Sequence, residues 1–179
     1  MKKTNCYKSY YKNGTIESEK YYKDDKLHNE NGAAGIWYYK NGIVQEKRWY
    51  INGEYHRNDG PAMIRYHENG KLQEEYWYKE GKLHKKDDPA VVYYYEQGTI
   101  QIQCWYNNNI RHRIDGPSII LYHQNGKIYE EYWYKDNKIH REDGPAIIEY
   151  NENGDIIRKE HYLNGKLVDE LVVLVGGNF

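Results

Sequence analysis

Residues 61–88 read PAMIRYHENGKLQEEYWYKEGKLHKKDD, and the same 28-residue pattern recurs along most of the chain. Each copy has an asparagine–glycine or glutamine–glycine step, whose glycines lie 28 residues apart at Gly14, Gly42, Gly70, Gly98, Gly126 and Gly154. A tyrosine recurs in the same phase at Tyr22, Tyr50, Tyr78, Tyr106, Tyr134 and Tyr162. No insertion or deletion interrupts the six copies, which cover about residues 7–168. The whole chain, 1–179, is therefore predicted to be one repeat array, in which each unit contacts mainly its neighbours.

Each copy contains two predicted hairpin turns. The first is the step that ends in glycine, as in Asn69–Gly70, and the second lies 11 residues later, as in Glu80–Gly81. The second residue of the later step is Asp, Gly or Asn, and these residues tolerate the positive φ of a type I′ turn. Between the turns we predict a short strand, Leu72–Tyr78, and a longer strand, Lys82–Tyr95. Because proline cannot donate a ladder hydrogen bond, the Asp-Gly-Pro step of the longer strand predicts a bulge or a bend.

These elements predict an all-β protein, built as a single elongated antiparallel β-meander of about 12 strands with two strands per repeat. After the proline, the alternation of Ala62, Ile64 and Tyr66 places these residues on one face of the sheet. At two strand spacings per repeat, the array is expected to be roughly 57 Å long. Leu171–Val175 departs from the repeat and is predicted either to cap the last strand or to pair with another subunit.

The composition limits the classes of function. The chain has 179 residues, a mean hydropathy of −1.12 and a formal charge of −1, with 26 basic and 27 acidic residues interspersed. This even mixture disfavours a nucleic-acid binder, which needs a clustered basic surface. Cys6 and Cys104 lie too far apart in the array for a disulfide framework, and the N-terminus has no apolar signal segment. No apolar run is long enough to span a membrane, so a cytoplasmic, reducing location is predicted.

A histidine recurs once per repeat, at His28, His56, His84, His112 and His140. The column is not predicted to bind metal, because neighbouring copies lie roughly 9.5 Å apart whereas ligands lie about 2 Å from an ion. It is predicted to order the bend, with an aspartate three residues later as acceptor, as at Asp59, Asp115 and Asp143. Gly42, Gly70 and Gly126 are assigned to the turns.

No motif in the sequence predicts an enzyme. The paired carboxylates Glu74–Glu75 and Glu130–Glu131 are adjacent in strands, so their side chains point to opposite faces and form no acid–base pair. Serine and cysteine lack the partners of a nucleophile, and no phosphate-binding glycine motif is present. We therefore predict no catalytic residue, no metal and no cofactor.

Aromatic residues are the best candidates for function. The chain has 22 Tyr and 5 Trp but 1 Phe, which favours rings that pack on one side and reach water with a polar atom. A second column holds Trp49, Trp77, Trp105 and Trp133, preceded in two copies by Tyr76 and Tyr132. These rings are predicted to form either a ladder that holds the sheet together or a platform for a ligand. Specificity is expected at the variable position before the second column, which holds Lys20, Arg48, Tyr76, Cys104, Tyr132 and Glu160.

The segments Trp77–His84 and Tyr66–Gly70 resemble the MORN (membrane occupation and recognition nexus) repeat in divergent form, over about residues 7–168. The resemblance implies hairpin pairs arranged in one long antiparallel sheet. The usual repeat is shorter and has H-G-x-G where this chain has H-R-x-D-G-P-A, which implies a longer, bulged strand after the histidine. That variant is similar to repeat families of large DNA viruses of amoebae and to antitoxin-like bacterial MORN proteins.

The leading functional prediction is a non-enzymatic scaffold for protein interaction or assembly, acting through a protein partner or through self-association. MORN-type arrays are associated with assembly and with phosphoinositide contact, so the resemblance implies membrane contact as an alternative. The repeated aromatic face suggests a carbohydrate or cell-wall binding array as a further alternative. No nucleic-acid partner is expected. If the chain is viral, the predicted location is the host cytoplasm or the virion.

Overall fold

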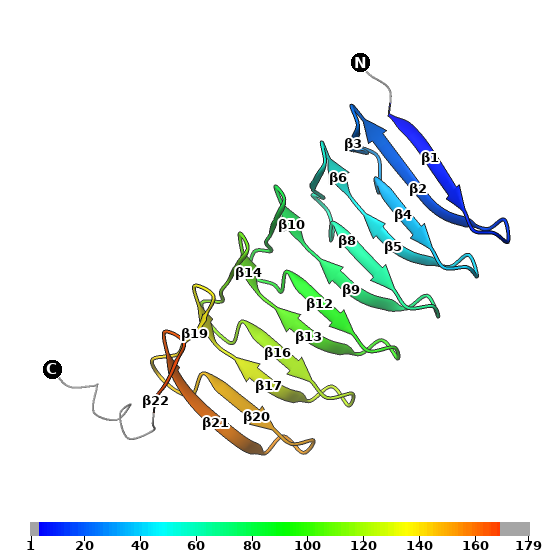
Figure 1. Ribbon diagram of the computed structural model, residues 1–179. Helices are drawn as coiled ribbons and strands as arrows, with labels where there is room; N and C mark the ends of the chain where they lie inside the picture. Colours follow the sequence, from blue (N-terminus) through cyan, green and yellow to red (C-terminus); the bar gives the residue numbers. More distant parts are fainter. Residues whose placement is uncertain (1–3, 169–179) are drawn as a thin grey trace.

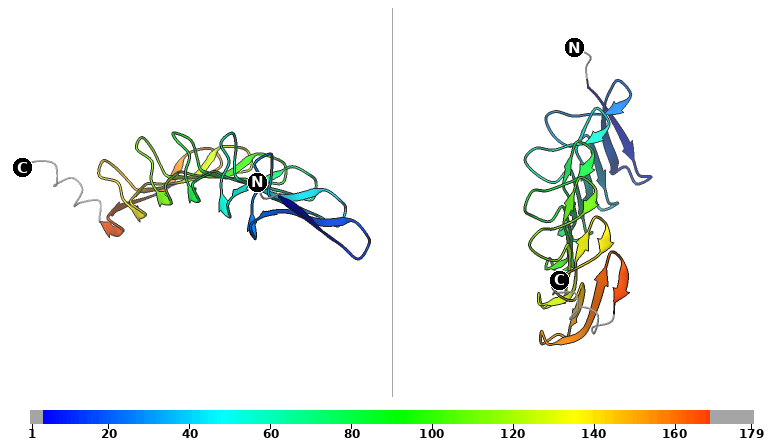
Figure 2. Two further views of the ribbon diagram at one scale, coloured as in Figure 1. Left: turned by 90° about the horizontal axis from the view of Figure 1, so that it is seen from above. Right: turned by 90° about the vertical axis from the view of Figure 1, so that its left-hand side faces the viewer.

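The computed structural model describes residues 4–168, and in this part the protein is all-β. A 14-stranded antiparallel sheet forms a long meander, in which successive strands along the chain lie side by side (Figure 1). Its order is β1 (Asn5–Tyr10), β2 (Ile16–Lys23), β4 (Gly35–Tyr38), β5 (Val44–Arg48), β8 (Met63–Tyr66), β9 (Leu72–Tyr76), β12 (Val91–Tyr94), β13 (Ile100–Cys104), β16 (Ile119–Tyr122), β17 (Ile128–Tyr132), β20 (Ile147–Tyr150), β21 (Ile156–Leu163) and β22 (Lys166–Val168), with β3 (Lys26–Leu27) beside β2. The predicted fold class is confirmed, and the row of strands bows gently along its length (Figure 2).

Four small hairpins stand outside this sheet, along the edge opposite the asparagine–glycine turns (Figure 1). They are β6 (Tyr50–Ile51) with β7 (Glu54–Tyr55), β10 (Tyr78–Lys79) with β11 (Lys82–Leu83), β14 (Tyr106–Asn107) with β15 (Ile110–Arg111), and β18 (Tyr134–Lys135) with β19 (Lys138–Ile139).

The predicted strand boundaries are wrong at these hairpins. The short strand Leu72–Tyr78 is interrupted at Trp77, and the long strand Lys82–Tyr95 ends at Leu83 and resumes at Val91. The Trp77 N–H donates to the Ala90 carbonyl at 2.7 Å, while the Trp77 carbonyl accepts from the His84 N–H at 3.0 Å. The N–H and the carbonyl of Trp77 thus bond to different neighbours, and the hydrogen-bond ladder passes from the sheet to the hairpin there and at Trp49, Trp105 and Trp133.

The two turns of each repeat are of different kinds. In the later turn both central residues have positive φ, as at Asn52 (53°) and Gly53 (86°), which confirms the predicted type I′ turn. In the earlier turn only the glycine is left-handed, as at Gly70 (81°), and the Gly70 N–H donates to the His67 carbonyl at 2.9 Å. This turn is followed by a register shift, because Arg65 pairs with Glu74 but Tyr66 pairs with Leu72. The bulge therefore lies near the glycine turn, whereas the chain bends without bulging at the proline.

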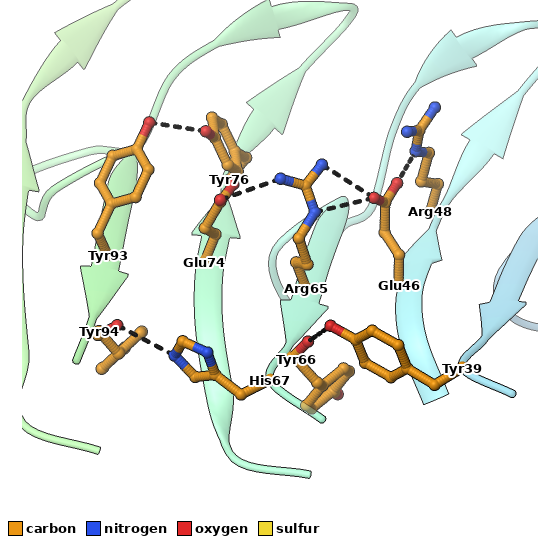
Figure 3. A network of polar contacts seen from close by, with 10 residues as sticks. All are labelled: Tyr39, Glu46, Arg48, Arg65, Tyr66, His67, Glu74, Tyr76, Tyr93 and Tyr94. Carbon is orange, nitrogen blue, oxygen red and sulfur yellow. Dashed lines mark hydrogen bonds and ion pairs between the residues drawn. The ribbon is translucent and has the colours of Figure 1, made fainter. Parts of the chain in front are cut away.

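The edge of the sheet that carries the earlier turns, such as Asn69–Gly70, is here called the glycine-turn edge. Along it, a side chain of one repeat donates a hydrogen bond to a backbone carbonyl of the next repeat (Figure 3). Tyr39 Oη donates to the Tyr66 carbonyl at 2.8 Å, and His67 Nε2 donates to the Tyr94 carbonyl at 3.3 Å. Tyr11, Tyr95 and His123 make the same contact 27 residues onward. Tyrosine and histidine replace each other here because each presents a donor at the end of a flat ring.

Buried side chains are confined to a thin layer. The residue after the proline is small and has no exposed surface, as at Ala62, Ala90 and Ala146. One face of the sheet, here called the uniform face, carries Ile36, Ile64, Val92, Ile120 and Ile148, alternating across strands with Glu19, Lys47, Glu75, Gln103, Glu131 and Lys159. No helix between residues 4 and 168 is long and apolar enough to cross a membrane. Leu171–Val175, for which a cap or pairing strand is predicted, lies outside the described residues.

Candidate interaction surfaces

The opposite face of the sheet does not repeat its chemistry, and it is here called the variable face. Its first row, read across the strands, is Ser18, Trp37, Glu46, Arg65, Glu74, Tyr93, Ile102, Leu121, Glu130, Glu149 and Arg158. Its second row is Lys20, Gly35, Arg48, Met63, Tyr76, Val91, Cys104, Ile119, Tyr132, Ile147 and Glu160. The variable column predicted to hold specificity is thus part of this face.

Near the N-terminal end of the variable face, Trp37 lies over the backbone of Gly35. A Cβ on Gly35 would approach the Trp37 ring to 2.4 Å, so the glycine makes room for the indole. Lys20 Nζ and Arg48 Cζ lie 5.6 Å and 4.7 Å from the ring centroid. The indole therefore lies between two cations, in a geometry that favours cation–π attraction.

Next to this ring lies a chain of alternating charges (Figure 3). Glu46 contacts Arg48 and accepts from Arg65 Nη2 at 3.0 Å, and Arg65 Nη1 donates to Glu74 at 3.0 Å. The Glu46 side chain is only 8% exposed, so its charge is stable there because two guanidinium groups contact it. At the other end of the face, Arg158 joins Glu130, Glu149 and Glu160 at 2.7, 2.9 and 3.1 Å.

Between these two ionic clusters the variable face is apolar. Tyr93, Ile102 and Leu121 occupy consecutive strands in the first row, next to Val91, Cys104 and Ile119 in the second row. Cys104 is 8% exposed, and burial raises the pKa of its thiol to about 11, so the thiolate is scarce at neutral pH. This apolar centre is flanked by charged clusters on both sides.

Tyrosines form the main aromatic ladder of the molecule. The ring centroids of Tyr50 and Tyr55 lie 4.3 Å apart, and Tyr55 stacks on Tyr78 at 4.6 Å. Tyr78 stacks on Tyr76 at 6.5 Å, and Tyr76 meets Tyr93 edge-on, with 2.8 Å between the two hydroxyl oxygens. The ladder joins the hairpins to the variable face. Tyr76, a predicted site residue, belongs to it, whereas Tyr132 on β17 has no ring contact within residues 4–168.

The tryptophan column has cations as its partners, and no two of its rings face each other among the described residues. A cation eight residues later lies about 4 Å above each ring: Arg57 over Trp49 (4.2 Å), Lys85 over Trp77 (4.0 Å), Arg113 over Trp105 (4.1 Å) and Arg141 over Trp133 (4.1 Å). Each ring therefore has one side covered by its own repeat.

No structural role for these cations was predicted from the sequence. Their contacts explain why arginine, aspartate, glycine and proline occur together in the R-x-D-G-P motif. Arg57 Nε donates to Asp59 at 3.0 Å and Arg57 Nη1 donates to the Pro61 carbonyl at 3.3 Å. A Cβ at Gly60 would lie 2.6 Å from the Arg57 guanidinium carbon, so glycine gives the guanidinium its place. In the third repeat the arginine is Lys85 and the glycine is Asp88, and the two form an ion pair at 3.3 Å.

The histidines bind partners other than the predicted aspartates. His28 Nδ1 accepts from the Asn52 N–H at 3.1 Å and His140 Nδ1 accepts from the Asn164 N–H at 3.0 Å, so each ring holds the turn of the next repeat. The other ring nitrogen meets the glutamate two residues later, at 3.2 Å for His28 and 3.1 Å for His140. Asp59 and Asp143 bind arginines instead. Among residues 4–168, no group of three or more histidines, cysteines or carboxylates is placed to hold a metal ion.

The fold and these surfaces define a tandem β-repeat protein with one constant and one varied face. The comparison with known families makes the class more specific: the MORN repeat variant model matches residues 3–24 and 62–80. Both stretches contain a strand, a glycine turn and the next strand, and together with the 28-residue period they support a MORN-type repeat protein. The H-R-x-D-G-P bends lie outside the matched stretches. No curated protein matches the chain.

Proposed function

We propose that the protein is a non-enzymatic scaffold and that its variable face binds a partner protein. One observation carries this proposal: the variable face exchanges aliphatic, aromatic and charged residues at one position from repeat to repeat, while the uniform face keeps an isoleucine or valine beside a polar residue in every repeat. A face that only held the sheet together would have no reason to change, because each repeat makes the same backbone contacts. Exchange between apolar and charged side chains on one face, while the other face keeps its pattern of apolar and polar positions, is what selection for a specific partner would leave.

The apolar centre gives the proposed docking surface its character. Tyr93, Ile102 and Leu121 are half-buried in the sheet, so a partner that covers them removes their remaining apolar surface from water. The ionic clusters around Arg65 and Arg158 form a polar rim, which contributes specificity and orientation more than affinity. Such a surface matches a partner with apolar anchors in the middle of its own interface.

The tryptophan column gives less support to carbohydrate binding than the variable face gives to protein binding. A sugar stacks on an open ring face, whereas each of these rings has a cation of its own repeat on one side. The described surfaces also lack the cluster of unpaired basic residues that would favour phosphoinositides, since Arg48, Arg65 and Arg158 are paired with glutamates.

Two neighbouring residues test the proposal. Ile102→Glu puts a carboxylate on the variable face, and Gln103→Glu puts the same carboxylate on the uniform face. Both changes copy other repeats, which carry Glu46, Glu74 and Glu130 in the first case and Glu19, Glu75 and Glu131 in the second. Both variants are thus expected to fold, which circular dichroism and thermal unfolding would check.

The measurement is quantitative affinity capture from the native host with wild type and both variants as bait. We expect the partners recovered with wild type to be reduced about tenfold or more with Ile102→Glu, since burying an unpaired charge at an interface centre costs several kcal/mol. Gln103→Glu should retain them. Equal recovery by the two variants would remove the variable face as the docking surface.

A further inference from the structure

A second set of surfaces lies on the side of the sheet that carries the tryptophan column. Successive bends of the chain leave grooves between them, and three such grooves are well formed. They lie between residues 29–32 and 56–59, between 84–87 and 112–115, and between 112–117 and 140–143, with volumes of about 700, 440 and 690 Å³. Each has one tryptophan in its lining: Trp49, Trp105 and Trp133 respectively.

The middle groove differs from the other two by its Trp105, while it shares His112 and Ile114 with the next groove. Trp105 Nε1 and His112 Nδ1 are buried and have no hydrogen-bond partner, although both residues line the groove. A buried donor without a partner costs about 1–3 kcal/mol, and a ligand that accepts from it recovers that cost. Ile114, at the rim, is 85% exposed and lines both this groove and the next one. Other repeats carry Glu30, Asn58, Lys86 or Glu142 at its position.

The spacing of the repeats indicates which peptide conformation can place equivalent side chains in neighbouring grooves. One repeat advances two strand spacings, or roughly 9.5 Å. A polyproline II helix has three residues per turn at about 3.1 Å each, so equivalent side chains recur about every 9.3 Å. A β-strand repeats a side-chain direction about every 6.6–6.8 Å, and an α-helix completes a turn in about 5.4 Å. Neither spacing matches the roughly 9.5 Å between equivalent positions of neighbouring repeats.

We propose that this row of grooves binds a proline-rich segment of a partner protein in the polyproline II conformation, with an apolar side chain at every third residue. The backbone carbonyls of such a helix have no internal hydrogen bonds, so one of them can accept from Trp105 Nε1. The apolar side chains pack against Ile114 and the tryptophan edges, as aromatic-lined grooves hold proline-rich segments. This surface is separate from the variable face, and the inference does not depend on the function proposed above.

Synthetic peptides test the period directly. The probe is the capped 12-residue peptide (Pro-Pro-Leu)4, and its control has the same composition in an order that places no two leucines three residues apart. Binding is followed by tryptophan fluorescence, since four of the five tryptophans line this side, and by calorimetry. We expect saturable binding of (Pro-Pro-Leu)4, at least about tenfold tighter than that of (Pro-Pro-Leu)2, because the longer peptide spans more of the row of grooves. The permuted peptide should bind at least fivefold more weakly.

A pair of isoleucine variants locates the site. Ile114→Glu copies Glu30 and Glu142, and is expected to weaken (Pro-Pro-Leu)4 at least fivefold. Ile110→Glu copies Glu54 on the small hairpin, adds the same charge to another exposed isoleucine, and should leave binding unchanged. The inference is overturned if no peptide binds, if the permuted peptide binds as well as (Pro-Pro-Leu)4, or if Ile114→Glu binds as wild type does. Because Ile102→Glu should not affect peptide binding, failure here leaves the result for the variable face independent.

Discussion

The two faces of the sheet share every backbone hydrogen bond, yet their side chains follow different rules. On the uniform face, an isoleucine or valine in each repeat packs beside a polar residue. Where that residue is Glu or Gln, a tyrosine donates to it, as Tyr94 donates to Glu75 at 2.7 Å and Tyr150 donates to Glu131 at 2.9 Å. On the variable face, the residue at one position is Glu46, Ile102 or Arg158 depending on the repeat. The backbone register therefore tolerates any of these side chains, and the constancy of the uniform face has to come from packing.

This contrast separates the residues that stabilise the array from those available to a partner. The buried apolar residues of the uniform face are Ile64, Val92, Ile120 and Ile148, and those of the second row of the variable face are Met63, Val91, Cys104 and Ile147. The bends add small buried alanines and the arginine–tryptophan contacts. The first row of the variable face holds charge networks and the half-buried apolar strip Tyr93, Ile102 and Leu121. Stability is thus expected to respond strongly to truncation of the buried isoleucines of the uniform face and weakly to truncation of this strip.

The largest effect is expected from truncating the uniform face. Ile120 is 8% exposed, and Ile120→Ala should lower the free energy of unfolding by about 2–4 kcal/mol through lost burial and a residual cavity. Ile102→Ala, on the variable face, should cost about half as much or less, because Ile102 is already partly in contact with water. Urea unfolding followed by circular dichroism measures both. Similar losses for the two variants would mean that the faces do not differ in their contribution to stability.

A smaller effect is expected from the arginine clamp. Gly60→Ala forces Arg57 away from Trp49, and should cost about 1 kcal/mol from the weakened cation–π contact and hydrogen bonds. The double change Arg57→Lys with Gly60→Asp reproduces the pair in the third repeat, Lys85 with Asp88. The double variant should lose less stability than the sum of the losses of Arg57→Lys alone and Gly60→Asp alone. Strict additivity in this double-mutant cycle would show that the two positions act independently.

The uniform face should also make stability fall in alkali. Burial, with a hydrogen bond to a glutamate, raises the pKa of Tyr38 and Tyr150 to about 12, compared with about 10 in an unfolded chain. Below pH 10 these phenols are protonated in both states. Above it the unfolded chain ionises first, so stability is lost as the pH rises from about 10 to about 12. Unfolding at pH 9.5 and 11.5 tests this, and Tyr150→Phe should lessen the loss. An unchanged slope would exclude Tyr150 as a source.

The smallest effect concerns the thiols. Cys104 lies in the apolar centre with its pKa raised to about 11, whereas Cys6 is exposed near the N-terminal edge. At neutral pH a maleimide should modify Cys6 quickly and Cys104 only after unfolding. Mass spectrometry of digested protein gives both rates. Rapid labelling of Cys104 in the folded protein would mean that the apolar centre opens readily.

The fold was largely predictable from the sequence because its determinants are local. The residues at Asn52–Gly53 favour the left-handed backbone of a type I′ turn, and the 28-residue period fixes how often that turn occurs. The break at Trp77 was not predictable, since tryptophan suits a strand. The break depends on the Trp77 N–H and carbonyl having partners on different neighbours, which only the three-dimensional arrangement defines.

The candidate surfaces were predictable only in part. The column with Arg48, Tyr76 and Cys104 varies visibly in the sequence, but its neighbours on the variable face follow from strand register, which a bulge shifts in each repeat. The histidine contacts were misassigned because an aspartate three residues away looked close. The partner of His140 is instead the turn N–H of Asn164, 24 residues later. The arginine clamp did leave a signal, since arginine occurs with glycine, and lysine with aspartate, at the same two positions.

The side chains that reach 27 residues onward at the glycine-turn edge have a consequence for how such a gene can change. Tyr39, His67 and Tyr95 each satisfy the carbonyl of the following unit, and each unit offers the same carbonyl in return. Duplication or loss of whole 28-codon segments therefore leaves each donor with an acceptor, whereas an in-frame deletion whose length is not a multiple of 28 codons displaces the contacts of both neighbours. The length of the protein can drift in steps of one unit, and the varied face lengthens or shortens with it.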